Sequence, residues 1–340
     1  MERKSYKGID IGKLICALLV VSIHCQFLMD KGEHLYRLYS TLVSGVAVPF
    51  FFICNGYFLE NKMQHCKDIA DIRMTITKQI NKILLPYFVF GGGYFLLNII
   101  ILWKIDGNNV ENAIRQQLWR WIVTSPGGPM WYLQSLLLTL CILYFIYRPN
   151  KLNAILVGFF ILFSFPYICT LPALKDSMLR ILYDGYKERF TTQSFLFRGF
   201  WIIWGMKVRR VIDDRSFIKK PTLILLLMGI AIATLQSEFS FNRWMYALTP
   251  ICLVIYISAF FVKMKMLTVR MVSTVVIRKL SIVVFYIHFA VIYIVKFGSK
   301  LLGKELGFTS LFIITSFLSI GVAWYIVKMD CRSFNKIFGL

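Results

Sequence analysis

Long apolar segments recur along nearly the whole chain, and they constrain the fold more than any other feature. The sequence of 340 residues is 58% hydrophobic, and only 16% of its residues are charged, against about 25% in soluble domains. A helix needs about 20 apolar residues to cross a bilayer, because its backbone polar groups must be paired internally. The sequence therefore predicts an all-α, polytopic integral membrane helical bundle.

About ten segments are long and apolar enough to be transmembrane helices. The candidate spans are 9–29, 43–59, 83–103, 130–147, 152–170, 193–208, 221–236, 245–263, 279–298 and 308–328. The longest gaps between them, 104–129 and 171–192, are only loop-sized, and no soluble domain fits there. Residues 1–340 are therefore expected to form one integral membrane domain. No feature of the sequence indicates an oligomeric state.

The basic residues predict the orientation of the chain. Segments on the side of the N-terminus hold 24 of the 39 lysines and arginines, and the opposite loops hold 13. Because basic loops are retained in the cytoplasm, both termini are predicted to be cytoplasmic. The net charge of +22 fits this topology, since each basic residue near anionic lipids contributes about 1 kcal/mol. Without a basic soluble module, nucleic acid is not an expected partner.

The densest basic cluster of the cytoplasmic side lies in Lys207–Lys220, where it can also attract a phosphorylated ligand. The eight cysteines are scattered, and none forms a C-x-x-C pair. Buried cysteines usually behave as small apolar side chains. We therefore expect neither a metal site nor a disulfide framework. The sequence also contains no glycine-rich phosphate loop and no recognisable Ser–Asp–His spacing.

The first span carries three ionisable side chains on one helical face. Ten residues separate Lys13 from His24, and eleven helical steps return to nearly the same face after a rise of about 16 Å. Asp10 joins this face one turn before Lys13. Ionisable groups in hydrocarbon are costly, so they indicate a functional site by default. The alternative is that Asp10 and Lys13 form an ordinary i, i+3 pair at a helix start.

Further polar and aromatic side chains lie in the other spans at inner, middle and outer depths. They are Asn55 (inner), His288 (middle), and Arg198, Trp131 and Tyr132 (outer, at the depth of His24). Each has a structural explanation: an arginine can extend to the interface, aromatic residues can anchor there, a histidine can bond a backbone carbonyl, and Asn55–Gly56 can end a helix. Together they can also line one path through the bundle.

A buried imidazole beside a water-accessible route is a candidate general base, because its pKa lies near working pH. Two function classes fit polar residues inside a bundle that lacks other catalytic motifs. They are acyl transfer from a soluble co-substrate and substrate transport.

Five segments resemble the membrane proteins of acyltransferase family 3, in the same order and over essentially the whole chain. They are GIDIGKLICALLVVSIHC, VAVPFFFICNGYFL, PMWYLQSLLL, FRGFWIIWGMKVRR and LSIVVFYIHF. The family signature in the first helix is an arginine, ten residues and a histidine. This chain has Lys13 in place of the arginine, and Asn55 where the family usually has serine. Lysine keeps the charge but lacks the planar fork that binds phosphate bidentately.

The resemblance implies a bacterial cell-membrane O-acyltransferase. Such proteins move an acyl group, often acetyl, from cytoplasmic acyl-CoA to a hydroxyl of a surface polysaccharide or lipid-linked sugar. It implies His24 as the catalytic base, with the acyl-CoA held by Lys13, Asp10 and Asn55. The acceptor would be contacted by Arg198, Trp131, Tyr132 and His288. The opening segments also resemble the membrane half of vancomycin-resistance serine racemases, which implies a serine permease-like module as the alternative.

Overall fold

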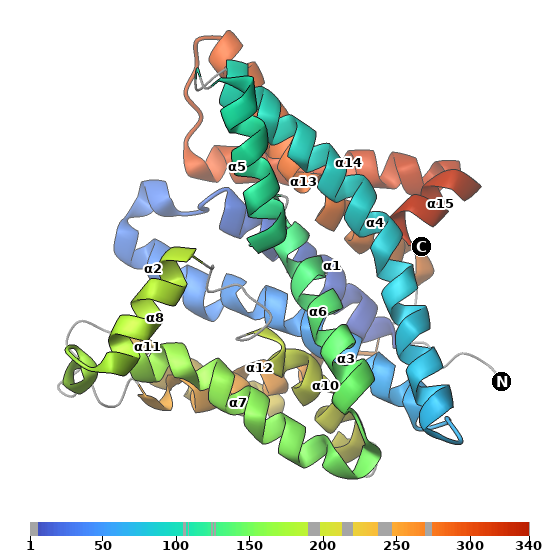
Figure 1. Cartoon of the computed structure of the whole chain (residues 1–340). Coiled ribbons are helices and arrows are strands. Elements are labelled where there is room, and N and C mark those ends of the chain that lie inside the picture. Colours follow the sequence, from blue (N-terminus) through green and yellow to red (C-terminus); the bar gives the residue numbers. More distant parts are fainter. Residues whose placement is uncertain are drawn as a thin grey trace.

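The computed structural model describes residues 6–104, 107, 109–123, 125, 127–189, 198–212, 220–236, 247–268 and 274–339. These residues form helices joined by short connections and contain no β-strand (Figure 1). The helices are α1 (Lys7–His24), α2 (Glu33–Leu42), α3 (Ala47–Met63), α4 (Ile69–Lys104), α5 (Val110–Val123), α6 (Met130–Ile146), α7 (Leu152–Cys169), α8 (Met178–Arg189), α10 (Phe200–Ile212), α11 (Pro221–Gln236), α12 (Thr249–Met266), α13 (Thr274–Leu301), α14 (Phe308–Met329) and α15 (Arg332–Phe338).

The prediction of a polytopic membrane bundle is confirmed. Within the described ranges, six helical segments are long and apolar enough to cross a membrane: Glu33–Met63, Ile69–Lys104, Pro149–Cys169, Thr249–Met266, Thr274–Leu301 and Phe308–Met329. The helices α6 and α11 are shorter but also apolar. Large apolar side chains such as Phe145, Leu302 and Phe317 point outward and are at least 70% exposed. Such a surface is compatible with lipid and not with water.

The interior of the bundle is occupied by α1 and α3. Figure 1 shows them between α13 and α14 on one side and α7, α10 and α12 on the other. The helix α3 packs against α1, α4, α10 and α12, and α1 packs against α12, α13 and α3. Because α1 is covered by other helices, it can carry Asp10 and Lys13 without exposing them to lipid.

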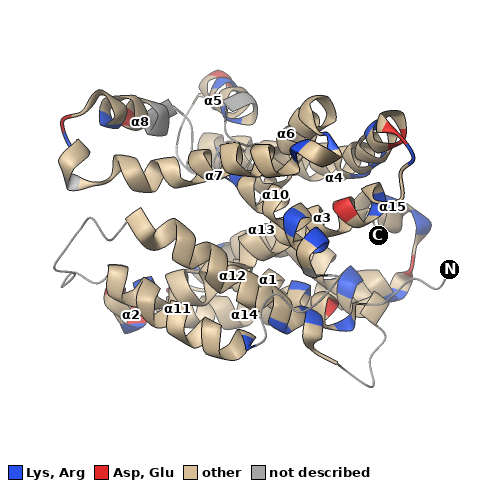
Figure 2. Cartoon of the chain, turned by 90° about the horizontal axis from the view of Figure 1, so that it is seen from below, with Lys and Arg blue, Asp and Glu red and all other residues tan. Residues whose placement is uncertain are grey.

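Successive spans run in opposite directions, so the bundle has two ends. The terminal end holds the start of α1, the C-terminal helix α15, and the last turns of α3, α6 and α10. Their contacts include Glu60 with Tyr147 and Arg210. The far end holds the last residue of α1 and the start of α14, which are linked through Asp30 and Thr309. In Figure 2 lysines and arginines gather near both termini and on α3 and α10.

The expectation that 104–129 and 171–192 are plain loops was wrong. They contain the helices α5 and α8. In α5, Ala113 and Gln117 are buried while most of the helix is exposed, which gives a narrow buried face at a spacing of four residues. A search for long apolar runs misses such a helix because its charged face lowers the average hydrophobicity.

Several predicted span boundaries also differ from the observed helices. The first span ends at His24 and not at residue 29, because Gln26 and Leu28 adopt positive φ angles of 53° and 74°, which a helix does not tolerate. The helix α4 has 36 residues and begins at Ile69, well before the predicted 83. The sixth span was predicted at 193–208. Its described helix ends at Ile212, and residues 193–197 lie outside the described residues.

The backbones of α3 and α10 come into direct contact at two glycines. A Cβ atom on Gly56 would overlap the carbonyl oxygen of Ile202, and one on Gly205 would overlap the carbonyl oxygen of Ile53. Small residues allow this approach between membrane helices. The alternative that Asn55–Gly56 ends a helix was therefore wrong, since Gly56 lies in the middle of α3.

We predict that Gly56→Ala and Gly205→Ala each destabilise the protein by about 3 kcal/mol, because the added methyl group forces two backbones apart. Thermal unfolding of the purified protein in detergent, followed by size-exclusion chromatography, measures the effect. Gly158→Ala on α7 is the matched control, because no atom lies within 4 Å of its added Cβ. Equal melting temperatures of all three variants would show that the backbones of α3 and α10 are less close than described.

Candidate active site

His24 and His288 form a stacked pair at the junction of α1 and α13. Their ring centroids are 5.5 Å apart and their planes differ by 27°. The Phe289 ring lies 4.4 Å from that of His24. The prediction that the two histidines occupy different depths is not supported, since packing of α1 on α13 places them side by side. The depths were counted from the predicted ends of the spans, and this count fails when the helices differ in length.

The hydrogen bonds of His288 fix its tautomer. Its Nδ1 lies 2.8 Å from the carbonyl oxygen of Phe285 and 3.2 Å from that of Val284. A carbonyl only accepts, so Nδ1 carries the proton and Nε2 has a free lone pair. This Nε2 is buried and has no hydrogen-bond partner in the described part of the chain. Because the rings are stacked, an in-plane N–H of one does not point at the other, and Nε2 stays open to a third group.

Asn55 and Tyr132 lie in direct contact beside this pair. Asn55 donates from Nδ2 to the Tyr132 hydroxyl at 2.7 Å and to the Phe51 carbonyl at 3.0 Å. The Tyr132 ring is 5.4 Å from that of Phe285, which is 6.3 Å from that of His288. The assignment of Asn55 to the inner depth and Tyr132 to the outer depth was therefore wrong. Asn55 lies in the middle of α3, and α6 begins at Met130 within the bundle interior.

Two other predicted residues lie apart from the histidines. Trp131 is half-buried against the core at the first turn of α6. Arg198 immediately precedes α10, and its electrostatic neighbours are Tyr167 of α7 and Tyr183 of α8. Of the predicted acceptor residues, the structure thus places Tyr132 and His288 together and Arg198 in a separate cluster.

Near the terminal end, Lys13 and Asp10 occupy a basic and aromatic environment. Lys13 Nζ lies 5.0 Å from the centre of the Phe58 ring, a distance that allows a cation–π interaction. Asp10 is only 7% exposed, and its electrostatic partners are Lys13, Arg278 and the Thr274 hydroxyl. The charge of Asp10 is therefore compensated within the bundle.

Two further cations surround the next ring on α3. Arg209 and Lys265 lie 5.6 Å and 5.3 Å from the centre of the Tyr57 ring. We refer to the group formed by Lys13, Arg209, Lys265, Tyr57 and Phe58 as the basic cluster. Sequence reasoning did not find its aromatic members. The signal was present, because Tyr57 and Phe58 lie two and three residues after Asn55, one helical turn from the polar end of α3.

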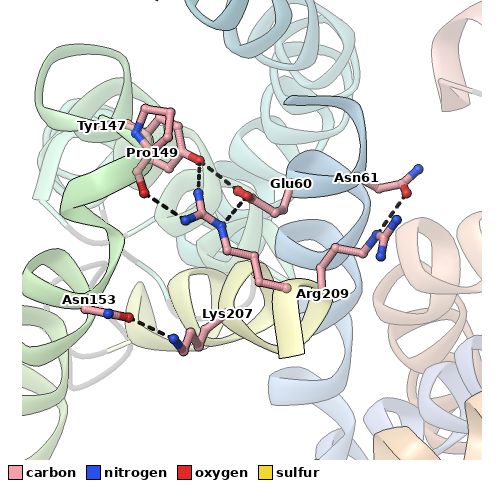
Figure 3. A network of polar contacts seen from close by, with 8 residues as sticks. Glu60, Asn61, Tyr147, Pro149, Asn153, Lys207 and Arg209 are labelled. Carbon is pink, nitrogen blue, oxygen red and sulfur yellow. Dashed lines mark hydrogen bonds and ion pairs between the residues drawn. The ribbon is translucent and has the colours of Figure 1, made fainter. Parts of the chain in front are cut away.

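Sequence reasoning also missed Glu60, a carboxylate that is 1% exposed. Arg210 donates to Glu60 Oε1 at 2.6 Å, to the Tyr147 hydroxyl at 2.8 Å and to the Pro149 carbonyl at 2.7 Å. The Tyr147 hydroxyl donates to Glu60 Oε2 at 2.9 Å. Figure 3 shows this network. In this network Arg210, one of the arginines of Lys207–Lys220, holds α3, α6 and α10 together. Residues 213–219 of that segment lie outside the described residues.

A cavity of about 540 Å³ opens beside this network at the terminal end. Its walls include Glu60, Arg210, Tyr147, Cys66 and Lys67. Neither histidine of the stacked pair is among its lining residues. The cavity therefore belongs to the polar terminal end and not to the histidine pair.

The loop that follows His24 is tied to the start of α14. The Thr309 hydroxyl donates to Asp30 Oδ1 at 2.6 Å, and these hydrogen bonds hold the pKa of the Asp30 carboxyl below its usual range. The Phe27 ring packs 5.2 Å from that of Tyr39 and 4.7 Å from that of Phe312. The loop is thus fixed next to the helix end that carries His24.

The fold and these clusters define a multi-pass membrane protein with a histidine pair inside its bundle. The acyltransferase domain family matches residues 6–328, and the chain therefore belongs to this acyltransferase 3 family. It is a membrane acyltransferase. The expected resemblance is confirmed over nearly the whole chain.

Two curated relatives share a short segment with the chain. An amino-acid racemase of Enterococcus faecalis is 43% identical over 58 residues, which is 17% of this chain and 8% of the relative. A serine/alanine racemase of Enterococcus gallinarum is 43% identical over 56 residues, 16% of this chain and 8% of the relative. The matched segment thus spans less than a tenth of the length of these relatives. No solved structure matches the chain.

We predict that Asp30→Asn lowers the melting temperature at pH 7 but not in strong acid. The carboxylate is favoured in the folded state, so its contribution is complete above the pKa of the unfolded chain, near 4, and is lost as the pH falls through the depressed folded-state pKa. Melting curves of both proteins from pH 7 to pH 3 test this. Glu305→Gln, at an exposed acid of the neighbouring loop, is the control. A difference in melting temperature that does not change with pH would contradict the stabilising role of the Asp30 carboxylate.

Proposed function

We propose that the protein is an O-acyltransferase of a bacterial cell membrane. It transfers an acyl group, acetyl in the simplest case, from cytoplasmic acyl-CoA to a hydroxyl of a surface polysaccharide or lipid-linked sugar. The observation that carries the proposal is the pair of the half-buried His24 and the buried His288, with Lys13 about 16 Å away along one face of α1. In this proposal the terminal end of the bundle faces the cytoplasm.

The basic cluster supports binding of the donor at the terminal end. Lys13, Arg209 and Lys265 supply positive charge for the phosphates of coenzyme A. The rings of Tyr57 and Phe58 supply apolar surface between these charges. From there the thioester arm would follow the face of α1 toward His24, with Asp10 holding Lys13 in place. Asn55 lies further along this route, where its hydrogen bond fixes the Tyr132 hydroxyl.

His24 would act as the general base of the transfer. One of its ring nitrogens takes the proton from the acceptor hydroxyl, and the oxygen attacks the thioester carbonyl carbon. When the new carbon–oxygen bond has formed, the carbon–sulfur bond breaks. The thiolate of coenzyme A leaves and takes up the proton from the imidazolium of His24. No other reactant is needed, and the ester and the thiol are the only products.

His288 would position the acceptor. Its Nε2 is an acceptor with a fixed orientation, because Nδ1 is held by the backbone carbonyl of Phe285. A second hydroxyl of the acceptor that donates to Nε2 would orient the neighbouring, reacting hydroxyl beside His24, which takes the proton of that reacting group. Fixed orientation of reacting groups is a large part of catalysis.

One observation favours a second function, the transport of an amino acid such as serine. The two curated relatives are named amino-acid racemase and serine/alanine racemase. In this case the polar residues of the bundle would line a permeation path, and no acyl-CoA would be required.

We predict that His24→Ala lowers the rate of acyl transfer by at least about 100-fold, the usual contribution of a general base. Protein in liposomes is supplied with labelled acetyl-CoA and a surface-glycan fraction, and the label in the glycan is counted. His34→Ala changes an exposed histidine of α2 and should leave the rate unchanged. If wild-type protein transfers no label but accumulates labelled serine without acyl-CoA, transport replaces acyl transfer as the function.

We predict that Lys13→Met raises the KM for acetyl-CoA about tenfold with little change in kcat, because one charged hydrogen bond to phosphate is worth about 1.5–3 kcal/mol. Lys13→Arg should keep the KM or lower it, since arginine adds the bidentate fork. The same assay with varied donor concentration measures both constants. Lys31→Met, at an exposed residue of the far end, is the control. An unchanged KM in Lys13→Met would remove Lys13 from the donor site.

A further inference from the structure

Arg198 and its neighbours form a polar cluster at the far end that the steps above do not use. We propose that this cluster binds the carboxylate group of an acidic ligand, and that this ligand is the acceptor, an acidic sugar residue. The second half of this statement rests on the proposed acyl transfer. The first half does not, because a carboxylate site can be measured without any acyl donor.

The side chain of Arg198 is partly buried and has no ion-pair partner in the described ranges. Its Nε is buried and makes no hydrogen bond there. Its electrostatic neighbours are the phenol groups of Tyr167 and Tyr183. The acid on the adjacent helix, Asp184, is already paired with Arg180 at 2.7 Å. The positive charge of Arg198 is thus left for another group to neutralise.

Two more buried polar atoms of the same region lack partners among the residues described. They are Ser164 Oγ on α7 and Trp201 Nε1 on α10. The Trp201 ring packs 5.1 Å from that of Phe163, the residue next to Ser164, so both atoms lie where α7 meets α10. Tyr167, an electrostatic neighbour of Arg198, follows Ser164 by three residues on the same face of α7, and Trp201 lies in the first turn of α10, three residues after Arg198.

These three groups have a common property: each can donate a hydrogen bond, and the indole and guanidinium can only donate. Buried polar groups are normally paired, so a cluster of unused donors indicates a ligand that brings acceptors. A ligand with a negative charge also neutralises Arg198 through a bidentate pair. A carboxylate matches the single cation of the cluster, whereas a phosphate monoester carries a charge of about −1.5 to −2.

The unpaired Arg198 has a consequence for the stability of the ligand-free protein. A partly buried arginine whose Nε lacks a partner is costly in the free protein, because it has lost solvation without gaining an ion pair. Arg198→Met should therefore melt at the same temperature as the wild type or higher, while losing the ligand. A purely structural role of Arg198 predicts the opposite, a lower melting temperature.

The test uses the full chain in detergent without acyl-CoA. Binding is measured for matched probes that differ in the carboxylate: glucuronate against glucose, galacturonate against galactose, and serine against serinol, with inorganic phosphate as a further anion. Wild-type protein should bind at least one uronate about tenfold more tightly than its neutral counterpart. Arg198→Met should abolish this preference, and Arg198→Lys should retain part of it. Arg37→Met, at an exposed arginine of α2, should behave as wild type.

The results distinguish a failure of the carboxylate site from a failure of the proposed acyl transfer. If wild-type protein prefers no carboxylate probe, or if Arg198→Met keeps the preference, the proposal is overturned. Phosphate binding as tight as the best carboxylate overturns the assigned ligand class. Preference for serine alone supports the carboxylate site but contradicts an acidic sugar as its ligand. Failure of the His24→Ala prediction, with uronate binding intact, contradicts only the acyl-transfer step.

Discussion

The backbone contact between α3 and α10 is the constraint on which the arrangement depends. It requires glycine at Gly56 and Gly205, and it fixes the rotation of α3 about its own axis. Once that rotation is set, Asn55 faces Tyr132, Tyr57 meets the cations of the basic cluster, and Glu60 reaches Arg210. One close crossing thus orients three functional regions along a single helix.

Charge compensation explains how polar side chains are tolerated inside this bundle. Asp10 has Lys13 and Arg278 as electrostatic neighbours, and Glu60 is paired with Arg210 and hydrogen-bonded to Tyr147. A paired and fully hydrogen-bonded charge is tolerated, whereas an unpaired one is costly. His288 Nε2 and Arg198 Nε are among the buried polar atoms without a hydrogen-bond partner in the described chain, and they are the two to which we assign ligands.

The sequence was sufficient to predict the membrane bundle, the apolar segments that form its long helices and the helix α1 that carries Lys13 and His24. Those predictions need only the length and period of apolar runs. Depth was not predictable in the same way. Asn55, Tyr132 and His288 were assigned to different layers, although Asn55 bonds Tyr132, and Tyr132 and His288 both lie next to the ring of Phe285. Their proximity depends on the helix end at His24 and on the start of α6, which are set by tertiary contacts. Glu60 and α5 were missed because neither has an apolar pattern.

The histidine pair has a consequence for how the protein is made. His24 belongs to α1 and His288 to α13, so 263 of the 340 residues lie between them. At a synthesis rate of about 5–20 residues per second, α13 reaches the membrane tens of seconds after α1. During that interval the far end of α1 has no partner ring, and Asp10 lacks Arg278. The histidine pair is therefore assembled only when α13 inserts, and a chain that stops before α13 does not form it.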